Sequence, residues 1–380
     1  MHDFLIKEIL NSNLENELET IGFDKTYIQK AKTKFEYRNF KIFDLSCAQA
    51  NILKQTALSV GADCGTHRQV ITGQIEKSCA LLGGSISQLQ KIGHKLQLQP
   101  FGLKHLGEKL IALETQTLPK RTQIMGVLNI TPNSFSDGGE FLDIENAKTH
   151  LNQLIADGAD IIDIGAESTK PYSKEVSAKT QIDRLHPILE FIKSTNIQTP
   201  ISIDTRNAEV AQKCIDLGAN IINDVSGFDF DPKMVEVIAN NPQIKVILQH
   251  SQGTPENMQL SPHYDNLMDE IFINLKSKID IAQSHNIQKE NIIVDPGIGF
   301  GKTKAHNMEI LKRWEELRGL GCPILIGLSR KSLLNMPEAT NEEKDIYTLA
   351  LDSILMTQKI DYIRVHNVKI HKKFQTIIDY

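Results

Sequence analysis

From residue 121 onward, short apolar runs alternate along the chain with longer amphipathic stretches. The apolar runs predict strands at 123–129, 161–166, 201–204, 221–224, 245–249, 292–295, 323–328 and 362–365. Most of them precede a helix-like segment, for example 207–217, 231–240, 264–285, 305–318 and 342–358. Such uniformly apolar strands are typical of a parallel sheet that is buried on both faces. Eight βα units in 260 residues predict an α/β fold, the (β/α)8 or TIM barrel, whose usual size is about 250 residues.

The first 120 residues show a different pattern. Leucine and isoleucine recur at three- and four-residue spacing between 85 and 115, which predicts helices divided by Pro100. The short, polar, proline-containing segment 118–122 then separates this region from the barrel pattern. We therefore predict an additional smaller N-terminal α/β domain at 1–120, of unknown role, and a catalytic barrel at 121–380.

Charge and composition exclude several classes of protein. The chain has 380 residues with 42 basic and 47 acidic side chains, a net charge of −5, which argues against a nucleic-acid partner. No apolar run reaches the roughly 18 residues of a membrane span, and the N-terminus lacks the regions of a signal peptide. The five cysteines form no Cys-x-x-Cys pair and are expected to be reduced thiols. A cytoplasmic protein without a membrane partner is the expectation.

Polar side chains stand at the ends of all eight predicted strands. They are Asn129, Glu167 with Thr169, Asp204, Asn223, His250, Asp295, Ser329 with Lys331, and Arg364 with His366. A single aspartate at such a place is more often a helix cap or a turn residue. Polar residues at the equivalent position of all eight βα units are not explained as caps. In a barrel these positions converge on the face that holds the active site.

Several motifs closely resemble one known family. The first strand leads into Gly126-Val-Leu-Asn-Ile-Thr-Pro-Asn-Ser-Phe-Ser-Asp-Gly-Gly139, and later units contain the segments 165–171, 202–205, 222–225, 295–302, 329–332 and 364–366. Together they resemble dihydropteroate synthase over residues 121–380. The resemblance implies a transferase of folate biosynthesis that condenses 6-hydroxymethyl-7,8-dihydropterin pyrophosphate with p-aminobenzoate, giving 7,8-dihydropteroate and pyrophosphate.

The resemblance also implies roles for individual side chains. Asp204, Asn223, Asp295 and Lys331 are expected to bind the pterin, whose edge offers N–H donors beside a carbonyl. Arg364 and His366 are expected to receive the pyrophosphate, with Asn129 helping to hold Mg²⁺ on it. The alternative for Arg364 and His366 is a structural network beneath the barrel rim. Departure of the diphosphate implies a cation on the pterin methylene, which Asp137 is expected to stabilise.

The p-aminobenzoate pocket is expected to form from Phe135, Thr169, Pro171, Phe300, Lys331 and Ser332. Sulfonamides, as mimics of p-aminobenzoate, are expected to compete there. The catalytic residues by this reading are Lys331, Asp137, Arg364 and His366. The loops 130–140 and 168–175 are either ordinary βα loops or segments that close over the site. The family is commonly dimeric through barrel helices, so a homodimer is expected.

Two other functions remain open from the sequence. A pterin-binding methyltransferase acting on a methyl-folate needs the floor of Asp204, Asn223 and Asp295, but not the Lys331-Ser332 or Arg364/His366 pairs. A non-catalytic pterin-binding barrel has no use for so many buried charges. Residues 1–120 do not resemble the aldolase or pyrophosphokinase that can be fused to the family.

Overall fold

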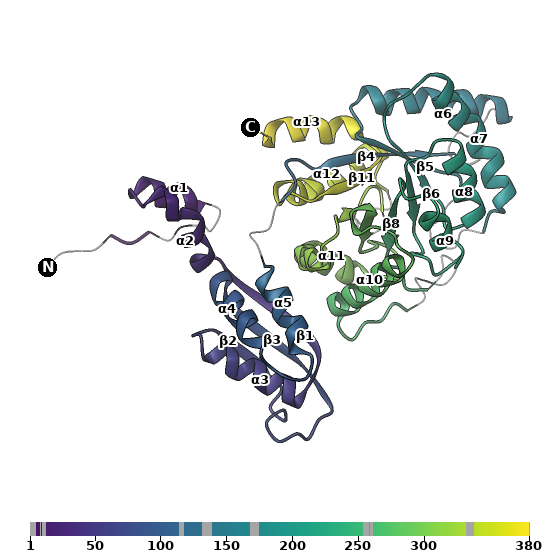
Figure 1. Cartoon of the computed structure of the whole chain (residues 1–380). Coiled ribbons are helices and arrows are strands. Elements are labelled where there is room, and N and C mark those ends of the chain that lie inside the picture. The colour runs from purple at the N-terminus through teal and green to yellow at the C-terminus, as the bar shows by residue number, and fades with distance from the viewer. Residues whose placement is uncertain are drawn as a thin grey trace. The chain divides into compact units, whose positions relative to one another are not determined.

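The chain forms two compact units, residues 1–117 and 118–380, in a computed structural model (Figure 1). The structure describes residues 5–7, 9, 13–113, 118–130, 139–167, 175–253, 258, 261–331 and 338–379, with the backbone alone at 139–143. Within these residues, no helix is both long enough and apolar enough to span a bilayer.

The N-terminal unit has a three-stranded antiparallel sheet in the order β1-β3-β2. Its elements are α1 (Leu14–Thr20), α2 (Ile28–Phe35), β1 (Tyr37–Ser46), α3 (Cys47–Leu58), β2 (Asp63–Thr66), β3 (Lys77–Ser85), α4 (Ile86–Leu96) and α5 (Leu103–Ile111), with a 3-10 turn at Lys25–Tyr27. Serine capping boxes at Ser46 and Ser85 start α3 and α4 directly after a strand. Leu53, Leu82 and Leu89 belong to a core that is separate from that of the barrel. The predicted helices on either side of Pro100 are α4 and α5.

The second unit is an eight-stranded parallel barrel. Its elements are β4 (Gln123–Asn129), α6 (Gly139–Ala156), β5 (Ile161–Gly165), α7 (Ala178–Ser194), β6 (Ile201–Asp204), α8 (Ala208–Asp216), β7 (Ile221–Asp224), α9 (Met234–Ala239), β8 (Lys245–Gln249), α10 (Leu267–Ser284), β9 (Ile292–Asp295), α11 (Lys304–Arg313), β10 (Leu325–Ile326), α12 (Asn341–Thr357), β11 (Tyr362–Val365) and α13 (Val368–Ile378), with 3-10 turns at Lys289–Asn291 and Trp314–Leu320. The strand order is β10-β11-β4-β5-β6-β7-β8-β9, and a parallel bridge between Val294 and Ile324 joins the two ends. The predicted fold class is thereby confirmed.

Several predicted elements are shorter in the structure than expected, among them a strand and a helix in the second half of the barrel. The strand expected at 323–328 is regular only at 325–326. Pro323 has no N–H to donate, and its carbonyl accepts from Val294 N at 2.9 Å. The helix expected at 305–318 ends at Arg313 and continues as the 3-10 turn.

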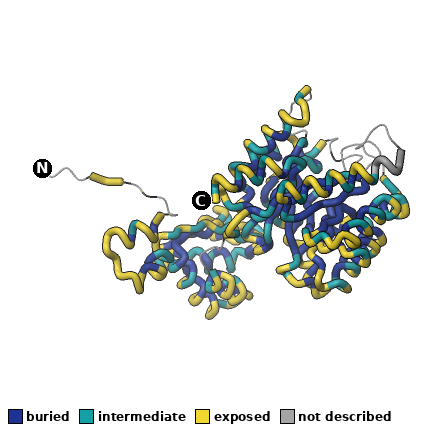
Figure 2. Tube along the Cα trace, turned by 90° about the horizontal axis from the view of Figure 1, so that it is seen from above, coloured by how far each residue is buried: buried dark blue, intermediate teal, exposed yellow. Residues whose placement is uncertain are grey.

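Alternation along the strands separates two apolar layers. One set of side chains faces the helices and forms the main core. Figure 2 shows the barrel strands as mostly buried, within helices that are more exposed. The other set faces the barrel axis and forms an interior layer of Met125, Ile161, Ile221, Ile247, Ile293 and Leu325. Two residues further along, the same interior face carries Val127, Asp163, Asn223, Gln249, Asp295 and Gly327. The barrel axis therefore changes from apolar to largely polar toward the carboxyl ends of the strands.

Candidate active site

Strand register places four residues at the strand ends side by side. Asn129 pairs with Gly165, Gly165 with Asp204, and Asp204 with Asn223. Gly165 contributes no side chain to this row, and a Cβ placed there would lie 3.4 Å from Asn129 Oδ1 and 3.8 Å from Asp204 Oδ2. An amide oxygen and a carboxylate oxygen thus both lie near a residue without a side chain.

An ion-pair network joins strands from opposite parts of the sequence. Arg364 on β11 donates from Nε to Asp163 Oδ2 at 2.5 Å and from Nη2 to Asp204 Oδ2 at 2.9 Å. Asn223 Nδ2 donates to the same Asp163 oxygen at 3.3 Å. Predicted residues from β6, β7 and β11 therefore meet inside the barrel.

His366 lies just beyond the end of β11. Its Nδ1 is 2.9 Å from Ser329 Oγ, and its backbone N–H donates to the same hydroxyl at 3.1 Å. Ser329 follows β10, so these contacts connect the ends of two neighbouring strands. Arg364 and His366 thus take part in contacts within the barrel, and their predicted contact with a diphosphate remains a prediction.

Asp295 is held by the loop that follows β9. Its Oδ1 accepts from Gly297 N at 2.7 Å. Gly297 has φ +70°, and a Cβ there would lie 1.9 Å from the His250 carbonyl oxygen. Burial raises the pKa of Asp295, against the attraction of Lys331 and Lys302. The loop therefore fixes a buried carboxylate whose free oxygen can accept from a ligand.

Lys331 and Phe300 lie beside Asp295. Lys331 Nζ donates to the Ile298 carbonyl at 2.6 Å and lies 4.8 Å from the centroid of the Phe300 ring. Burial lowers the pKa of Lys331 to about 8, although Asp295 opposes the shift. A cation, an aromatic face and a carboxylate are thus gathered at the ends of β9 and β10.

Asp204 has a strongly perturbed pKa. Burial raises it, Arg364 and Lys331 oppose the shift, and Asp163 and Glu167 add to it, so that the pKa is about 7. Buried titratable groups of both signs in one barrel mouth are typical of a functional site.

Sequence reasoning missed three charged residues near the mouth. Asp163 is fully buried, and its signal was a charge inside the apolar run Ile161-Ile162-Asp163-Ile164. Arg206 pairs with Glu167 at 3.2 Å.

The third missed residue is Lys302. It is buried and donates to the Phe300 and His250 carbonyls at 3.0 and 3.3 Å, with its Nζ 2.9 Å from His250 Nδ1. Burial lowers its pKa to about 7. Burial also lowers the pKa of His250, so its neutral ring accepts at Nδ1. Lys302 therefore ties the loop after β9 to the end of β8.

Five predicted site residues lie outside the described residues. They are Phe135, Asp137, Thr169, Pro171 and Ser332. Their predicted roles in the p-aminobenzoate pocket and in cation stabilisation stay predictions.

No cluster of three or more His, Cys, Asp or Glu side chains able to hold a metal occurs in the described part of the chain. A bound Mg²⁺ usually has few protein ligands and several oxygens from water and phosphate. The single predicted ligand, Asn129 Oδ1, is compatible with this kind of site.

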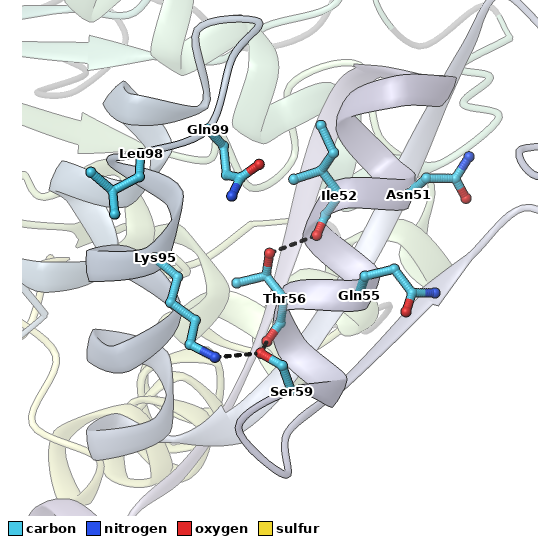
Figure 3. A pocket seen from close by; sticks show the side chains of 8 residues that line it. All are labelled: Asn51, Ile52, Gln55, Thr56, Ser59, Lys95, Leu98 and Gln99. Carbon is cyan, nitrogen blue, oxygen red and sulfur yellow. Dashed lines mark hydrogen bonds between the residues drawn. The ribbon is translucent and has the colours of Figure 1, made fainter.

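A separate groove of about 520 Å³ lies in the N-terminal unit (Figure 3). It runs between α3 and the C-terminal end of α4, where Lys95 Nζ donates to Ser59 Oγ at 2.7 Å. Its lining is mostly amide and hydroxyl side chains, and none of the predicted site residues is among them: Asn51, Ile52, Gln55, Thr56, Ser59, Lys95, Leu98 and Gln99.

Comparison with known proteins gives consistent matches. The family model described as pterin binding enzyme matches residues 125–366. Dihydropteroate synthase of Clostridium beijerinckii is 44% identical over 253 residues, which are 66% of this chain and 90% of that protein. The bifunctional dihydropteroate synthase/dihydropteroate reductase of Helicobacter pylori is 35% identical over 370 residues, 97% of this chain and 96% of that protein. The crystal structure of Yersinia pestis dihydropteroate synthase with a sulfonamide drug has a TM-score of 0.64 and 37% identity, covering 70% of this chain and 96% of that one.

These matches agree with a polar barrel mouth that joins residues from β5, β6, β7 and β11. The activity is a transfer that condenses 6-hydroxymethyl-7,8-dihydropterin pyrophosphate with p-aminobenzoate, yielding 7,8-dihydropteroate for folate biosynthesis. The chain belongs to the pterin binding enzyme family, as one of its dihydropteroate synthases.

Proposed function

We propose that Asp295, Asp204, Asn223 and Lys331 bind the pterin ring. The observation that carries this proposal is the convergence of buried acceptors from three strands at the carboxyl ends of the barrel strands. Asp295 has one oxygen free of the Gly297 contact, and Lys331 lies near enough to interact with it electrostatically. Carboxylates accept from the N–H groups of the pterin edge, while the ammonium group donates to its carbonyl.

Arg364, His366 and Asn129 are the proposed diphosphate site. The guanidinium has five N–H donors, and the contacts with Asp163 and Asp204 use two of them. The remaining donors are available for a bidentate contact with phosphate oxygens. Mg²⁺ held by Asn129 and the diphosphate would neutralise charge on the leaving group.

Phe300 and Lys331 are proposed to contact p-aminobenzoate, together with Phe135, Thr169, Pro171 and Ser332. The cation–π geometry of Lys331 over Phe300 supports a site that accepts an aromatic anion. Sulfonamides are proposed to compete for this site. Asp137 is proposed to stabilise the cationic pterin methylene.

The decisive experiment measures pyrophosphate release by the full chain with Mg²⁺. Release is expected only when the pterin diphosphate and p-aminobenzoate are both present. Equal release without the aromatic amine would indicate a hydrolase and would contradict the proposed site.

A second activity is proposed for the N-terminal unit, the reduction of dihydropteroate. The Clostridium beijerinckii synthase matches 66% of the chain, whereas the Helicobacter pylori protein, whose name includes a reductase, matches 97% of it. A match of 97% must include most of the unit of residues 1–117, which has its own core. In the reduction, a hydride from a reduced nicotinamide dinucleotide adds to the carbon of the 5,6 C=N bond, and a proton adds to the nitrogen. The products are tetrahydropteroate and the oxidised nicotinamide.

The test compares the full chain with the fragment 118–380. The fragment should retain synthase activity, because a related barrel makes up 90% of the Clostridium protein. Only the full chain should oxidise the nicotinamide when dihydropteroate is added. Equal oxidation by the fragment would place the reductase in the barrel, and no oxidation by either would refute the proposal.

A homodimer in the cytoplasm is also proposed. Ile346 and Ile354 are eight residues apart on α12 and more than half exposed, as is Ile377 on α13. Exposed apolar side chains on barrel helices suit a contact with a second copy of the chain. All five cysteines are free, as expected in a reducing compartment. Light scattering after gel filtration tests the dimer, and a monomer at micromolar concentration would contradict it.

A further inference from the structure

Asp163 lies in the middle of β5 and faces the barrel axis. It is two residues from Gly165 and pairs in register with Val127 on one side and Ser202 on the other. The side chain is 0% exposed. Its position is therefore directly below Gly165 in the polar row of strand ends, and a ligand bound against that row would lie above it.

The Asp163 carboxylate decides how the amide of Asn223 is oriented. An ionised carboxylate only accepts hydrogen bonds, so the Asn223 atom 3.3 Å from it must be the Nδ2 donor. The carbonyl oxygen Oδ1 then points away from Asp163. This buried oxygen has no hydrogen-bond partner within the described part of the chain. Buried polar atoms are nearly always paired in proteins, so this acceptor is suited to a ligand N–H or a bound water.

The same carboxylate provides Arg364 with a second counter-ion. Arg364 contacts Asp163 through Nε and Asp204 through Nη2. When a ligand N–H competes for Asp204, Arg364 remains paired with Asp163. Arg364 is 21% exposed, and a largely buried arginine without a counter-ion would be unfavourable.

We propose that Asp163 is a positioning residue for pterin recognition, which presents Asn223 Oδ1 as a hydrogen-bond acceptor and keeps Arg364 paired while Asp204 binds the ring. The inference rests on the proposed pterin site. Asp163 acts through Asn223 and Arg364 and needs no contact with the substrate. It adds a specificity-determining residue from β5 to the residues expected from the strand ends.

The test uses the full chain and the isosteric substitution Asp163→Asn. An asparagine side chain both donates and accepts, so it no longer dictates the orientation of Asn223. We expect the Kd for 6-hydroxymethyl-7,8-dihydropterin by calorimetry, and the KM for its diphosphate, to rise about tenfold or more. The KM for p-aminobenzoate should change less than twofold. Asp163→Ser, which leaves space for a water, should show the same selective loss and serves if the asparagine variant does not fold.

Asp352→Asn is the matched control. Asp352 is also a 0% exposed carboxylate with one unpartnered oxygen, and it contacts His371 at 3.0 Å between α12 and α13. This variant should lose stability and keep the pterin Kd. If Asp163→Asn leaves the pterin Kd within twofold, or weakens both substrates equally, the inference is overturned.

A double-mutant cycle distinguishes a positioning role from an independent one. The double variant Asp163→Asn/Asn223→Ala should have a weakened pterin Kd, but one clearly lower than the value obtained by multiplying the fold increases of the two single variants. Full additivity would overturn the inference. Absence of pterin binding by the unaltered chain would refute the proposed pterin site itself, so the two failures are distinguishable.

Discussion

The pH dependence of pterin affinity tests the electrostatics of the barrel mouth most directly. In the proposed site, Asp204 is the stronger acceptor for the pterin N–H groups when it is ionised, and burial with the charges of Asp163 and Glu167 raises its pKa to about 7. Lys331 donates most strongly when protonated, and burial lowers its pKa to about 8. Affinity should therefore rise with pH through about 7 and fall again above about 8.

The size of this pH effect follows from the fraction of molecules in which Asp204 is ionised and Lys331 is protonated. At pH 7.5 about 0.6 of the molecules combine an ionised Asp204 with a protonated Lys331, against about 0.1 at pH 6 or pH 9. The Kd should rise about sixfold on each side. Because a neutral amine still donates, the alkaline limb should be the shallower one.

Calorimetry with 6-hydroxymethyl-7,8-dihydropterin measures the affinity without the titration of a diphosphate. Asp204→Asn should abolish the acid limb, and Lys331→Met should abolish the alkaline limb. Arg364 opposes the rise in the pKa of Asp204, so Arg364→Gln should move the acid limb to higher pH. A Kd constant from pH 6 to 9, or an acid limb that persists in Asp204→Asn, would refute the reasoning.

Three further predictions concern single features of the site. Asp295→Ala should raise the pterin Kd about 100-fold because the proposed paired contact is lost, with circular dichroism unchanged; an unchanged calorimetric Kd would exclude Asp295 from the site. Gly297→Ala places a methyl group 1.9 Å from the His250 carbonyl and should lower pterin affinity at least tenfold. Its control is Gly218→Ala, at φ +104° with nothing within 4 Å, which should cost about 1 kcal/mol of stability and leave affinity intact. Similar Kd values for the two variants would contradict this prediction. Chelation of Mg²⁺ should stop pyrophosphate release and spare the binding of the unphosphorylated pterin, and full release in excess chelator would contradict a metal requirement.

The strand-end rule accounts for much of the candidate site. The rule identified residues that each stand at the end of an apolar run, namely Asn129, Asp204, Asn223 and Asp295. In a parallel barrel the carboxyl ends of all strands lie on the same face. Asp163 escaped the rule because it lies in the middle of β5. A charge within an apolar run has no assigned partner until the barrel closes and brings Arg364, 201 positions away in sequence, within 2.5 Å.

Lys302 was missed for a related reason, although its contact His250 was among the predicted strand ends. Lys302 follows Gly301 in a segment with glycines at alternate positions, and local pattern does not specify where such a chain turns. The turn is set by contact, since Cβ atoms at Gly297 and Gly301 would lie 1.9 and 2.4 Å from carbonyl oxygens of His250 and Gln252. Only this packing brings the ammonium group of Lys302 into reach of His250 Nδ1.

The sequence by itself determined the alternation of strands and helices, the barrel class, the face on which the polar ends gather and the family. These properties depend on hydrophobic periodicity and short motifs, which are local along the chain. Only the tertiary structure decided which charges pair, which amide oxygen of the mouth stays without a partner, and how burial moves the pKa values of Asp204 and Lys331 toward neutrality. Pairing and desolvation depend on distances between residues from different strands, and these distances exist only once the barrel has closed.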